Sequence, residues 1–504
     1  MLFNSYEFIF AFLPITFFIY FYLNHKRLTI ASKGFLVFAS LFFYSWWNIL
    51  YLPIILSSML FNFIIGSSLN EAKNSKKIKF SKKQILTFGI LSNISLLGYF
   101  KYTDFFIENF NLATSSNVEL LSLALPLAIS FFTFQQIAYL VDSYRQETKE
   151  YDFLNYAVFV TFFPQLIAGP IVHHKEMMPQ FANKRNTVKN YKNIAMGLFI
   201  FSIGLFKKVV IADTFAVWAT AGFDTATTLN LFEAWATSLS YTFQLYFDFS
   251  GYTDMAIGLA LLFNIKLPIN FNSPYKATDI QDFWRRWHIT LSRFLKDYVY
   301  IPLGGNRKGE FRTYNNLLAT FIIGGIWHGA GWTFVFWGFL HGIALVIHRA
   351  WGILCKKLGF KIWTWLAWLI TFNFVNISWI FFRAKEWDDA VKILGSMFSV
   401  DYIVLPNLLE SRLPFLTDLG IKFGGFVANI QGDYFTPVWL VLGFIFILIF
   451  KNSVQKINNF TLNYKTALLT TVALAGGILS LNKVSEPLRF DSAVRVPAII
   501  TSEF

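Results

Sequence analysis

The chain has 504 residues, of which 55% are hydrophobic and only 14% are charged, and its mean hydropathy is +0.48. Soluble domains carry charge on about a quarter of their residues, so this composition excludes a soluble protein and predicts a polytopic membrane protein. The net charge is +14, but lysine and arginine cluster in short loops between apolar runs, which is typical of cytoplasmic loops. We interpret this charge as a topology signal and a surface for anionic lipids or phosphate-bearing ligands, not for nucleic acid.

The apolar runs predict an all-α fold with about 11 to 13 membrane segments in one integral-membrane domain, residues 1–485. The first run has no basic region before it and no cleavage site after it, so we expect it to remain as a transmembrane helix. The single cysteine, Cys355, excludes an internal disulfide bond. The predicted segments are residues 8–23, 35–47, 49–66, 85–100, 120–140, 153–172, 194–212, 232–247, 252–265, 317–347, 362–382, 437–450 and 466–482.

The loops predict the orientation of these segments. Residues 73–83 contain six lysines and are the strongest cytoplasmic marker, which places the amino terminus outside. Simple alternation would then put the basic loop at residues 173–192 outside as well, against the charge rule. A partial or re-entrant segment would remove this conflict, and the sequence leaves open which segment it is. Residues 384–435 form the largest polar connection and are more acidic than the other loops, so we expect them on the extracytoplasmic side.

Residues 278–298 predict an amphipathic helix that begins with a capping box formed by Thr278 and Gln281. Aromatic and aliphatic residues recur along one side, and arginine and lysine occupy the rest. One interpretation is an interfacial helix whose arginines pair with lipid phosphates. The other is a cytoplasmic rim that also attracts a phosphate-bearing donor. His288 lies on the apolar stripe, where it has either a structural or a chemical role.

Two acidic residues, Asp248 and Asp254, interrupt the apolar stretch before this helix. Carboxylates at membrane depth need partners, and we expect Arg285 or Arg286 to provide them. The alternative is that they line a tunnel or orient a histidine.

A long run without Asp, Glu, Lys or Arg lies between Arg312 and Arg349 and carries His328 among four glycines. An ionisable side chain at membrane depth is costly and therefore indicates function. The glycines allow a backbone or ligand to approach closely. They are also consistent with two shorter helices that meet near the histidine, in place of one long helix. His341 and His348 share a helix face, but their spacing matches no common zinc motif, so we predict no metal site.

Five motifs together resemble the membrane-bound O-acyltransferase (MBOAT) family. They are residues 163–170 (FPQLIAGP), 246–254 (YFDFSGYTD), 282–292 (DFWRRWHITLS), 300–307 (YIPLGGNR) and 327–332 (WHGAGW). The sequence is most similar to the bacterial branch that acetylates polysaccharides, which includes AlgI-like and PatA-like proteins, with the PatA-like peptidoglycan O-acetyltransferases favoured. The resemblance extends from near the amino terminus to about residue 485.

The resemblance implies a helical bundle around a central transmembrane tunnel in the bacterial cytoplasmic (inner) membrane. It implies acetyl-CoA as the cytoplasmic donor substrate, with no bound cofactor, and a periplasmic partner protein that accepts or transfers the acetyl group. The family's essential histidine corresponds to His328, and its second histidine to His288. The residues that we expect to line the tunnel or bind the donor are Trp284, Arg285, Arg286, Trp287, Trp327, Trp332, Asp248 and Asp254.

One departure from the family lies in the carboxy-terminal tail, residues 486–504. Members of this branch usually end in an aromatic segment that contains a tyrosine, whereas this chain has no tyrosine after Tyr464. We therefore assign no acceptor tyrosine.

The predicted activity is an O-acetyltransferase that passes acetyl across the membrane for O-acetylation of peptidoglycan. In this reaction a histidine acts as general base on a hydroxyl group. The same chemistry could instead serve alginate, teichoic acid or another surface polymer. A different class of function is a proton-coupled transporter in which Asp248, Asp254 and His328 form a relay, although the chain shows no internal repeat.

Overall fold

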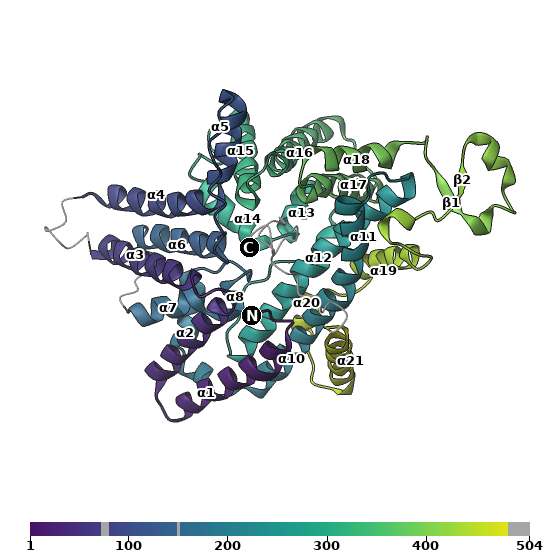
Figure 1. Cartoon of the computed structure of the whole chain (residues 1–504). Coiled ribbons are helices and arrows are strands. Elements are labelled where there is room, and N and C mark those ends of the chain that lie inside the picture. The colour runs from purple at the N-terminus through teal and green to yellow at the C-terminus, as the bar shows by residue number, and fades with distance from the viewer. Residues whose placement is uncertain (72–79, 149–151, 482–504) are drawn as a thin grey trace.

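The structure is a computed structural model that describes residues 1–71, 80–148 and 152–481 (Figure 1). Nearly all regular structure in these ranges is helical, and the two short strands form one parallel pair. The helices are α1 (Leu13–His25), α2 (Thr29–Ser45), α3 (Tyr51–Glu71), α4 (Lys82–Lys101), α5 (Thr103–Thr114), α6 (Ile129–Tyr144), α7 (Phe153–Thr161), α8 (Phe163–Leu166), α9 (His174–Ala182), α10 (Tyr191–Phe206), α11 (Asp213–Thr220), α12 (Leu231–Leu262), α13 (Ile280–Arg286), α14 (Ile289–Leu295), α15 (Glu310–His328), α16 (Trp332–Leu358), α17 (Thr364–Arg383), α18 (Trp387–Phe398), α19 (Thr436–Leu448), α20 (Ser453–Asn458) and α21 (Tyr464–Leu481). The strands are β1 (Val404–Pro406) and β2 (Lys422–Gly424).

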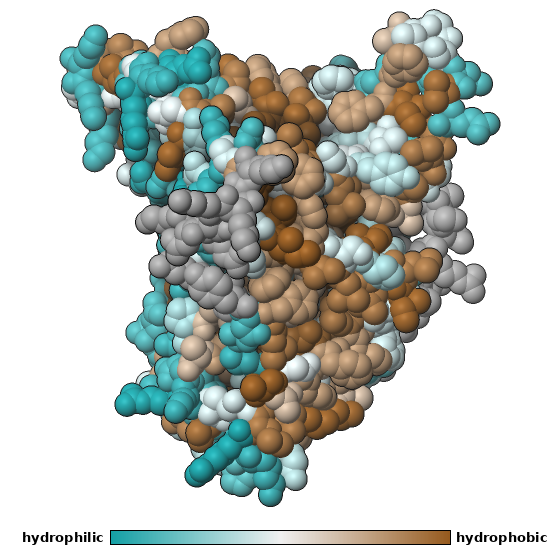
Figure 2. Space-filling model, turned by 90° about the vertical axis from the view of Figure 1, so that its left-hand side faces the viewer, coloured by the Kyte–Doolittle hydropathy of each residue, from teal (hydrophilic) through white to brown (hydrophobic). Residues whose placement is uncertain are grey.

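Six helical stretches within the described ranges are long and apolar enough to cross a membrane. Two shorter apolar helices, α2 and α19, accompany them. Hydrophobic side chains cover a broad area of the face drawn in Figure 2, with hydrophilic side chains gathered around its margins. These features confirm an all-α, multi-pass membrane protein. The six stretches are Glu7–His25, Tyr51–Asn70, Tyr191–Thr225, Trp332–Leu358, Thr364–Arg383 and Tyr464–Leu481.

The centre of the fold is α12, a helix of 32 residues and therefore roughly 48 Å long. Almost all of its side chains are buried, and it packs most extensively against α10. Glycines make this contact possible. A β-carbon on Gly204 would lie 2.5 Å from the carbonyl oxygen of Gly251, and one on Gly197 would lie 2.7 Å from that of Gly258.

The two ends of α12 lie in different surroundings. At its start, the backbone N–H of Leu231 donates to Tyr402, within the acidic connection between α17 and α19. Just beyond its end, Asn264 donates to the carbonyls of Asn186 and Val188, within the basic loop that precedes α10. The basic loop and the acidic connection therefore lie on opposite sides of the bundle, as the charge pattern predicts. We call the end of α12 near Asn264 the basic side.

The structure differs from the prediction in four places. The segments at 232–247 and 252–265 are one helix, α12, because Gly251 makes a helix contact there and does not break the chain. The segment at 120–140 becomes helical only at Ile129. The segment at 153–172 is divided into α7 and α8, and its last residues are buried but not helical, which makes it the partial segment that would remove the charge conflict.

The fourth difference concerns residues 278–298, which form two short helices, α13 and α14, and not one. The helical conformation is interrupted at His288. Asp279, and not Thr278, caps α13, because its side chain accepts a hydrogen bond from the backbone N–H of Asp282. The tail at 486–504 and most of the lysine-rich stretch at 73–83 lie outside the described residues.

Candidate active site

Helices α15 and α16 form a hairpin whose turn carries His328. Helix α15 ends at this residue, and α16 begins shortly after it, at Trp332. The two helices touch because Gly325 has no side chain: a β-carbon there would lie 2.3 Å from the carbonyl oxygen of Phe334. The helix break predicted near the histidine is confirmed, and it places the imidazole at a helix end.

The His328 side chain is buried among aromatic rings, with 7% of its surface exposed. The ring centroids of Trp327, Trp337 and Phe382 lie 4.7, 5.2 and 5.0 Å from its imidazole. Rings packed this closely limit the rotation of the imidazole and keep bulk water away from it. A general base must be held in this way to act on a single bound hydroxyl group.

Lys101 and Tyr102, at the junction of α4 and α5, bind the main chain at the end of α15. The Lys101 ammonium donates to the carbonyls of Trp327 at 2.5 Å and His328 at 3.1 Å, and the Tyr102 hydroxyl donates to the carbonyl of Ile326 at 2.7 Å. The last carbonyls of a helix lack partners within the helix and carry the negative end of its dipole, so a cation is favourable there. Two adjacent side chains thus hold three consecutive carbonyls and fix the backbone that carries the imidazole.

The second predicted histidine, His288, connects α13 and α14 in a left-handed backbone conformation, with a φ of +42° and 2% of its surface exposed. Its Nδ1 lies 3.3 Å from Oδ1 of Asn270, an oxygen that also accepts from the N–H and hydroxyl of Thr290. Because Oδ1 accepts hydrogen bonds, the proton of the neutral imidazole sits on Nδ1. The lone pair is on Nε2, a buried atom with no hydrogen-bond partner among the described residues. His288 therefore presents a proton-accepting nitrogen.

A third histidine, His341 on α16, has both ring nitrogens occupied. Its Nδ1 accepts from the indole N–H of Trp284 at 3.2 Å, and its Nε2 lies 3.0 Å from the hydroxyl of Ser378. That hydroxyl donates to the carbonyl of Val375, so His341 must donate to it and carries its proton on Nε2. His341 thus joins α13, α16 and α17 and has a structural role.

Ring contacts connect the three histidines. His288 contacts Phe249 at 4.8 Å, and contacts through Phe271, Trp287 and Trp379 continue from there to Trp337. The ring of Trp337 contacts the other two histidines, at 5.2 Å from His328 and 4.9 Å from His341. The structure therefore brings the two predicted catalytic histidines into one aromatic cluster.

A cavity of about 810 Å³ opens between α13, α14, α15 and α16, and we call it the basic cavity. Two of its arginines are neutralised, since Arg293 pairs with Glu176 at 2.6 Å and Arg349 with Glu310 at 2.7 Å. Within the described parts of the chain, the structure shows no ion pair for its other cationic side chains. These are Arg285, Lys296 and Lys356.

Two tryptophan rings connect the basic cavity to His328. Trp284 lines the cavity, and its ring centroid lies 5.9 Å from Trp337, which in turn contacts His328. Thr320 on α15 also lines the cavity, and His328 follows eight residues later, roughly 12 Å along the helix axis. A donor held in the cavity would therefore be about two helical turns from the imidazole.

Of the other predicted site residues, Arg285 lines the basic cavity, whereas Arg286 pairs with Asp282 at 2.8 Å. Trp287 is buried against Trp379 at 5.0 Å. Trp327 contacts His328 directly. Trp332, in contrast, has 61% of its surface exposed and donates to Asn109 at 2.9 Å, so it lies at the edge of the site.

Asp248 and Asp254 pair with lysines of the neighbouring helix, so the prediction that Arg285 or Arg286 would pair with them is wrong. Lys208 lies 2.7 Å from Asp248, and Lys207 lies 2.7 Å from Asp254. Both lysines stand at the end of α10, which the glycine contacts bring against α12. Asp254 also accepts a hydrogen bond from Ser453. These pairs link α10, α12 and α20, which indicates a structural role.

Sequence reasoning missed four residues of the site: Lys101, Tyr102, Asn270 and Trp337. Lys101 could have been predicted as a buried contact, because it directly follows a long apolar run and its ammonium group there needs a hydrogen-bond acceptor. The contacts of Asn270 and Trp337 join separate helices and loops, so the sequence pattern within one element gives no indication of them.

Comparison with known proteins shows the family of the chain. Residues 17–385 match the MBOAT, membrane-bound O-acyltransferase family. The chain is 56% identical over 442 residues to the peptidoglycan O-acetyltransferase of Helicobacter pylori, covering 82% of this chain and 83% of that protein. It is 40% identical over 418 residues to the "Probable alginate O-acetylase AlgI" of Pseudomonas putida, covering 82% and 83%. It is 29% identical over 286 residues to the teichoic acid D-alanyltransferase of Streptococcus thermophilus, covering 51% and 68%.

The family match covers the hairpin of α15 and α16, both candidate catalytic histidines and every element that lines the basic cavity. It disfavours the transporter alternative. The chain belongs to the membrane-bound O-acyltransferase family and is a multi-pass membrane enzyme of that class.

Proposed function

We propose that the chain takes acetyl from acetyl-CoA on the basic side of the bacterial inner membrane and passes it to an acceptor on the other side, for O-acetylation of peptidoglycan. The observation that carries the proposal is the position of the basic cavity, about two helical turns from His328, with the rings of Trp284 and Trp337 connecting the two. The 56% identity to a peptidoglycan O-acetyltransferase supports the choice of polymer.

The basic cavity suits a donor that carries phosphates at one end and a thioester at the other. Arginine binds phosphate through paired hydrogen bonds and lysine through its point charge, so Arg285, Lys296 and Lys356 supply the charge that such a donor requires. The thioester end is then directed along α15 toward His328. Acetyl-CoA acts as a substrate in this scheme, and the chain needs no bound cofactor.

The proposed reaction uses His328 as the general base. Its imidazole takes the proton from the acceptor hydroxyl, and the hydroxyl oxygen attacks the carbonyl carbon of the thioester. The carbon–sulfur bond then breaks, the leaving sulfur receives the proton from the imidazolium, and CoA is released as the thiol. His288 offers Nε2 as a second proton acceptor beside the same cluster. The acetyl acceptor in this scheme belongs to a periplasmic partner protein that delivers acetyl to the polymer.

The direct test compares cell-wall muropeptides from cells that carry the chain unchanged or with His328→Ala. We expect the O-acetylated fraction to fall to the level of cells that lack the chain, while the amount of protein in the membrane stays the same. The matched control is His25→Ala, because this exposed histidine lies at the end of α1, away from the site.

Full muropeptide acetylation in the His328→Ala cells would overturn the assignment of the base. Unacetylated muropeptides in every strain, together with chain-dependent acetylation of another surface polymer such as alginate, would show that the polymer is wrong and the chemistry right.

A further inference from the structure

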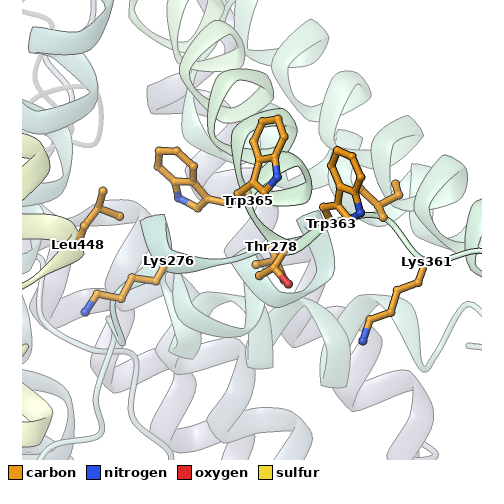
Figure 3. A pocket seen from close by; sticks show the side chains of 9 residues that line it. Lys276, Thr278, Lys361, Trp363, Trp365 and Leu448 are labelled. Carbon is orange, nitrogen blue, oxygen red and sulfur yellow. The ribbon is translucent and has the colours of Figure 1, made fainter.

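A second cavity, of about 1040 Å³, lies on the basic side at the start of α17, away from the active site (Figure 3). Four separate parts of the chain form its walls: the segment before α13, the connection from α16 to α17, the first turns of α17, and the end of α19. Among its lining residues are Lys276, Thr278, Lys361, Trp363, Trp365 and Leu448. We call it the Trp–Lys groove.

The polar and apolar groups of the groove are separated. Figure 3 shows the side chains of Lys276 and Lys361 extending to one side, with the Thr278 hydroxyl between them. The indole rings of Trp363 and Trp365 rise on the other side. The groove is therefore amphipathic, with cations and a hydroxyl donor along one side and flat apolar rings along the other.

Both lysines can bind an anion. In the parts of the chain that the structure describes, no carboxylate pairs with Lys276 or Lys361. The acidic residue nearest to Lys276 in sequence is Asp279. Its carboxylate caps the backbone of α13 and lies 3.7 Å from Nε2 of His348, so it already has other partners. In Figure 3 the two lysines stand on opposite flanks of the groove with the Thr278 hydroxyl between them, so its polar side offers a phosphate group a hydroxyl donor and a cation on either flank.

The apolar side continues into the membrane face of the protein. Trp363 and Trp365 have 70% and 59% of their surfaces exposed, and Leu369, one turn after Trp365 on the same face of α17, has 41%. A third tryptophan, Trp368, is held rigid because its indole N–H donates to the carbonyl of Tyr275 at 2.9 Å. Tryptophan is favoured at the membrane interface, where its ring meets both headgroups and acyl chains.

We propose that the Trp–Lys groove is a binding site for an anionic phospholipid of the basic-side leaflet. Its phosphate lies on the polar side of the groove, beside Thr278 and the lysines that flank it, and one acyl chain runs over Trp363 and Trp365 along α17. The charge of the groove selects the lipid, since a zwitterionic headgroup would bring its own cation against the two lysines. Cytoplasmic leaflets supply anionic lipids, and each basic residue near such a surface increases lipid partitioning about fivefold.

The test reconstitutes the full chain in phosphatidylcholine vesicles that contain a small fraction of brominated lipid, which quenches tryptophan fluorescence on contact. The chain has 16 tryptophans, so the signal of the groove is the part of the quenching that disappears in Trp363→Phe/Trp365→Phe. Brominated phosphatidylglycerol should quench this part at concentrations roughly tenfold or more below those that brominated phosphatidylcholine needs.

The substitution pair Lys276→Gln/Lys361→Gln should abolish this preference. The matched control, Lys184→Gln/Lys192→Gln, removes the same charge from exposed positions on the basic side outside the groove, and the preference should remain. Free glycerol phosphate should not relieve the quenching, because it lacks acyl chains.

Equal quenching by the two lipids, or a preference that remains after Lys276→Gln/Lys361→Gln, would overturn the proposal. Relief by free glycerol phosphate would also overturn it, since the groove would then bind a soluble phosphate. None of these outcomes depends on acetyl transfer, so the test is independent of the proposed function.

Discussion

At the scale of single residues, the site is built by fixing two imidazoles in different ways. The backbone of His328 is held by Lys101 and Tyr102, and the ring of His288 is held by Asn270. His328 could be predicted from sequence because an ionisable group in an uncharged run is conspicuous, whereas His288 was indicated by the family resemblance of its basic stretch. Their supporting residues could not, because Lys101 lies 227 positions before His328 and no local pattern joins them.

Lys101→Met should lower the rate of acetyl transfer by about tenfold to a hundredfold, because the carbonyls at the end of α15 lose their cation and the imidazole shifts. Lys101→Arg keeps the charge and donors and should restore part of the rate. The measurement is the initial rate in membranes with equal amounts of protein. The control is Lys33→Met, which removes a similar single contact, to Asn155 at 2.7 Å. Loss of rate in the Lys33 variant, or none in Lys101→Met, would contradict this role.

His288 and His341 should respond differently to removal, because only His288 has an unoccupied nitrogen. We expect His288→Ala to lower the transfer rate by about 10²-fold or more with little change in melting temperature. His341→Ala should instead lower the melting temperature, since it leaves Trp284 and Ser378 with broken hydrogen bonds, at a cost of about 1–3 kcal/mol each. The reverse pattern would exchange the two roles.

At the scale of elements, two helix pairs position the site: α15 with α16, and α10 with α12. In both, glycine replaces a side chain where one backbone passes another. The sequence predicted the first pair because the glycines flank a histidine. The predicted pattern had two segments in place of α12, because Gly251 in a polar stretch resembles a helix break when the helix packed against it is not known. The pattern also had one helix in place of α13 and α14, because hydrophobic periodicity continues through His288 although the helical backbone is interrupted there.

Gly204→Ala should destabilise the bundle, because the new β-carbon would lie 2.5 Å from the carbonyl oxygen of Gly251, and this backbone atom cannot move independently. Overpacking of this kind costs about 1–3 kcal/mol or more. The measurement is the thermal unfolding of purified protein in detergent. Gly34→Ala is the matched control, as nothing lies within 4 Å of the added β-carbon. Equal melting temperatures for the two variants would show that the contact between α10 and α12 does not limit stability.

At the scale of the whole molecule, charge and shape define two different sides. The basic loops and the basic cavity lie near the end of α12, and the acidic connection lies near its start. The α15 backbone runs from the basic cavity to His328. Sequence composition predicted this polarity, since positive charge marks the cytoplasmic side. It could not predict the cavity, because the walls come from four helices whose packing depends on contacts distant in sequence. The central tunnel implied by the family remains a prediction.

The most direct test of the central claim supplies acetyl-labelled acetyl-CoA to membrane vesicles of known orientation from cells that make the chain and its partner. Inside-out vesicles expose the basic side to the medium, and right-side-out vesicles expose the other. We predict that label reaches the lumenal material only in inside-out vesicles, and that His328→Ala eliminates this transfer. Equal transfer in both orientations, or undiminished transfer in the His328→Ala vesicles, would contradict the account.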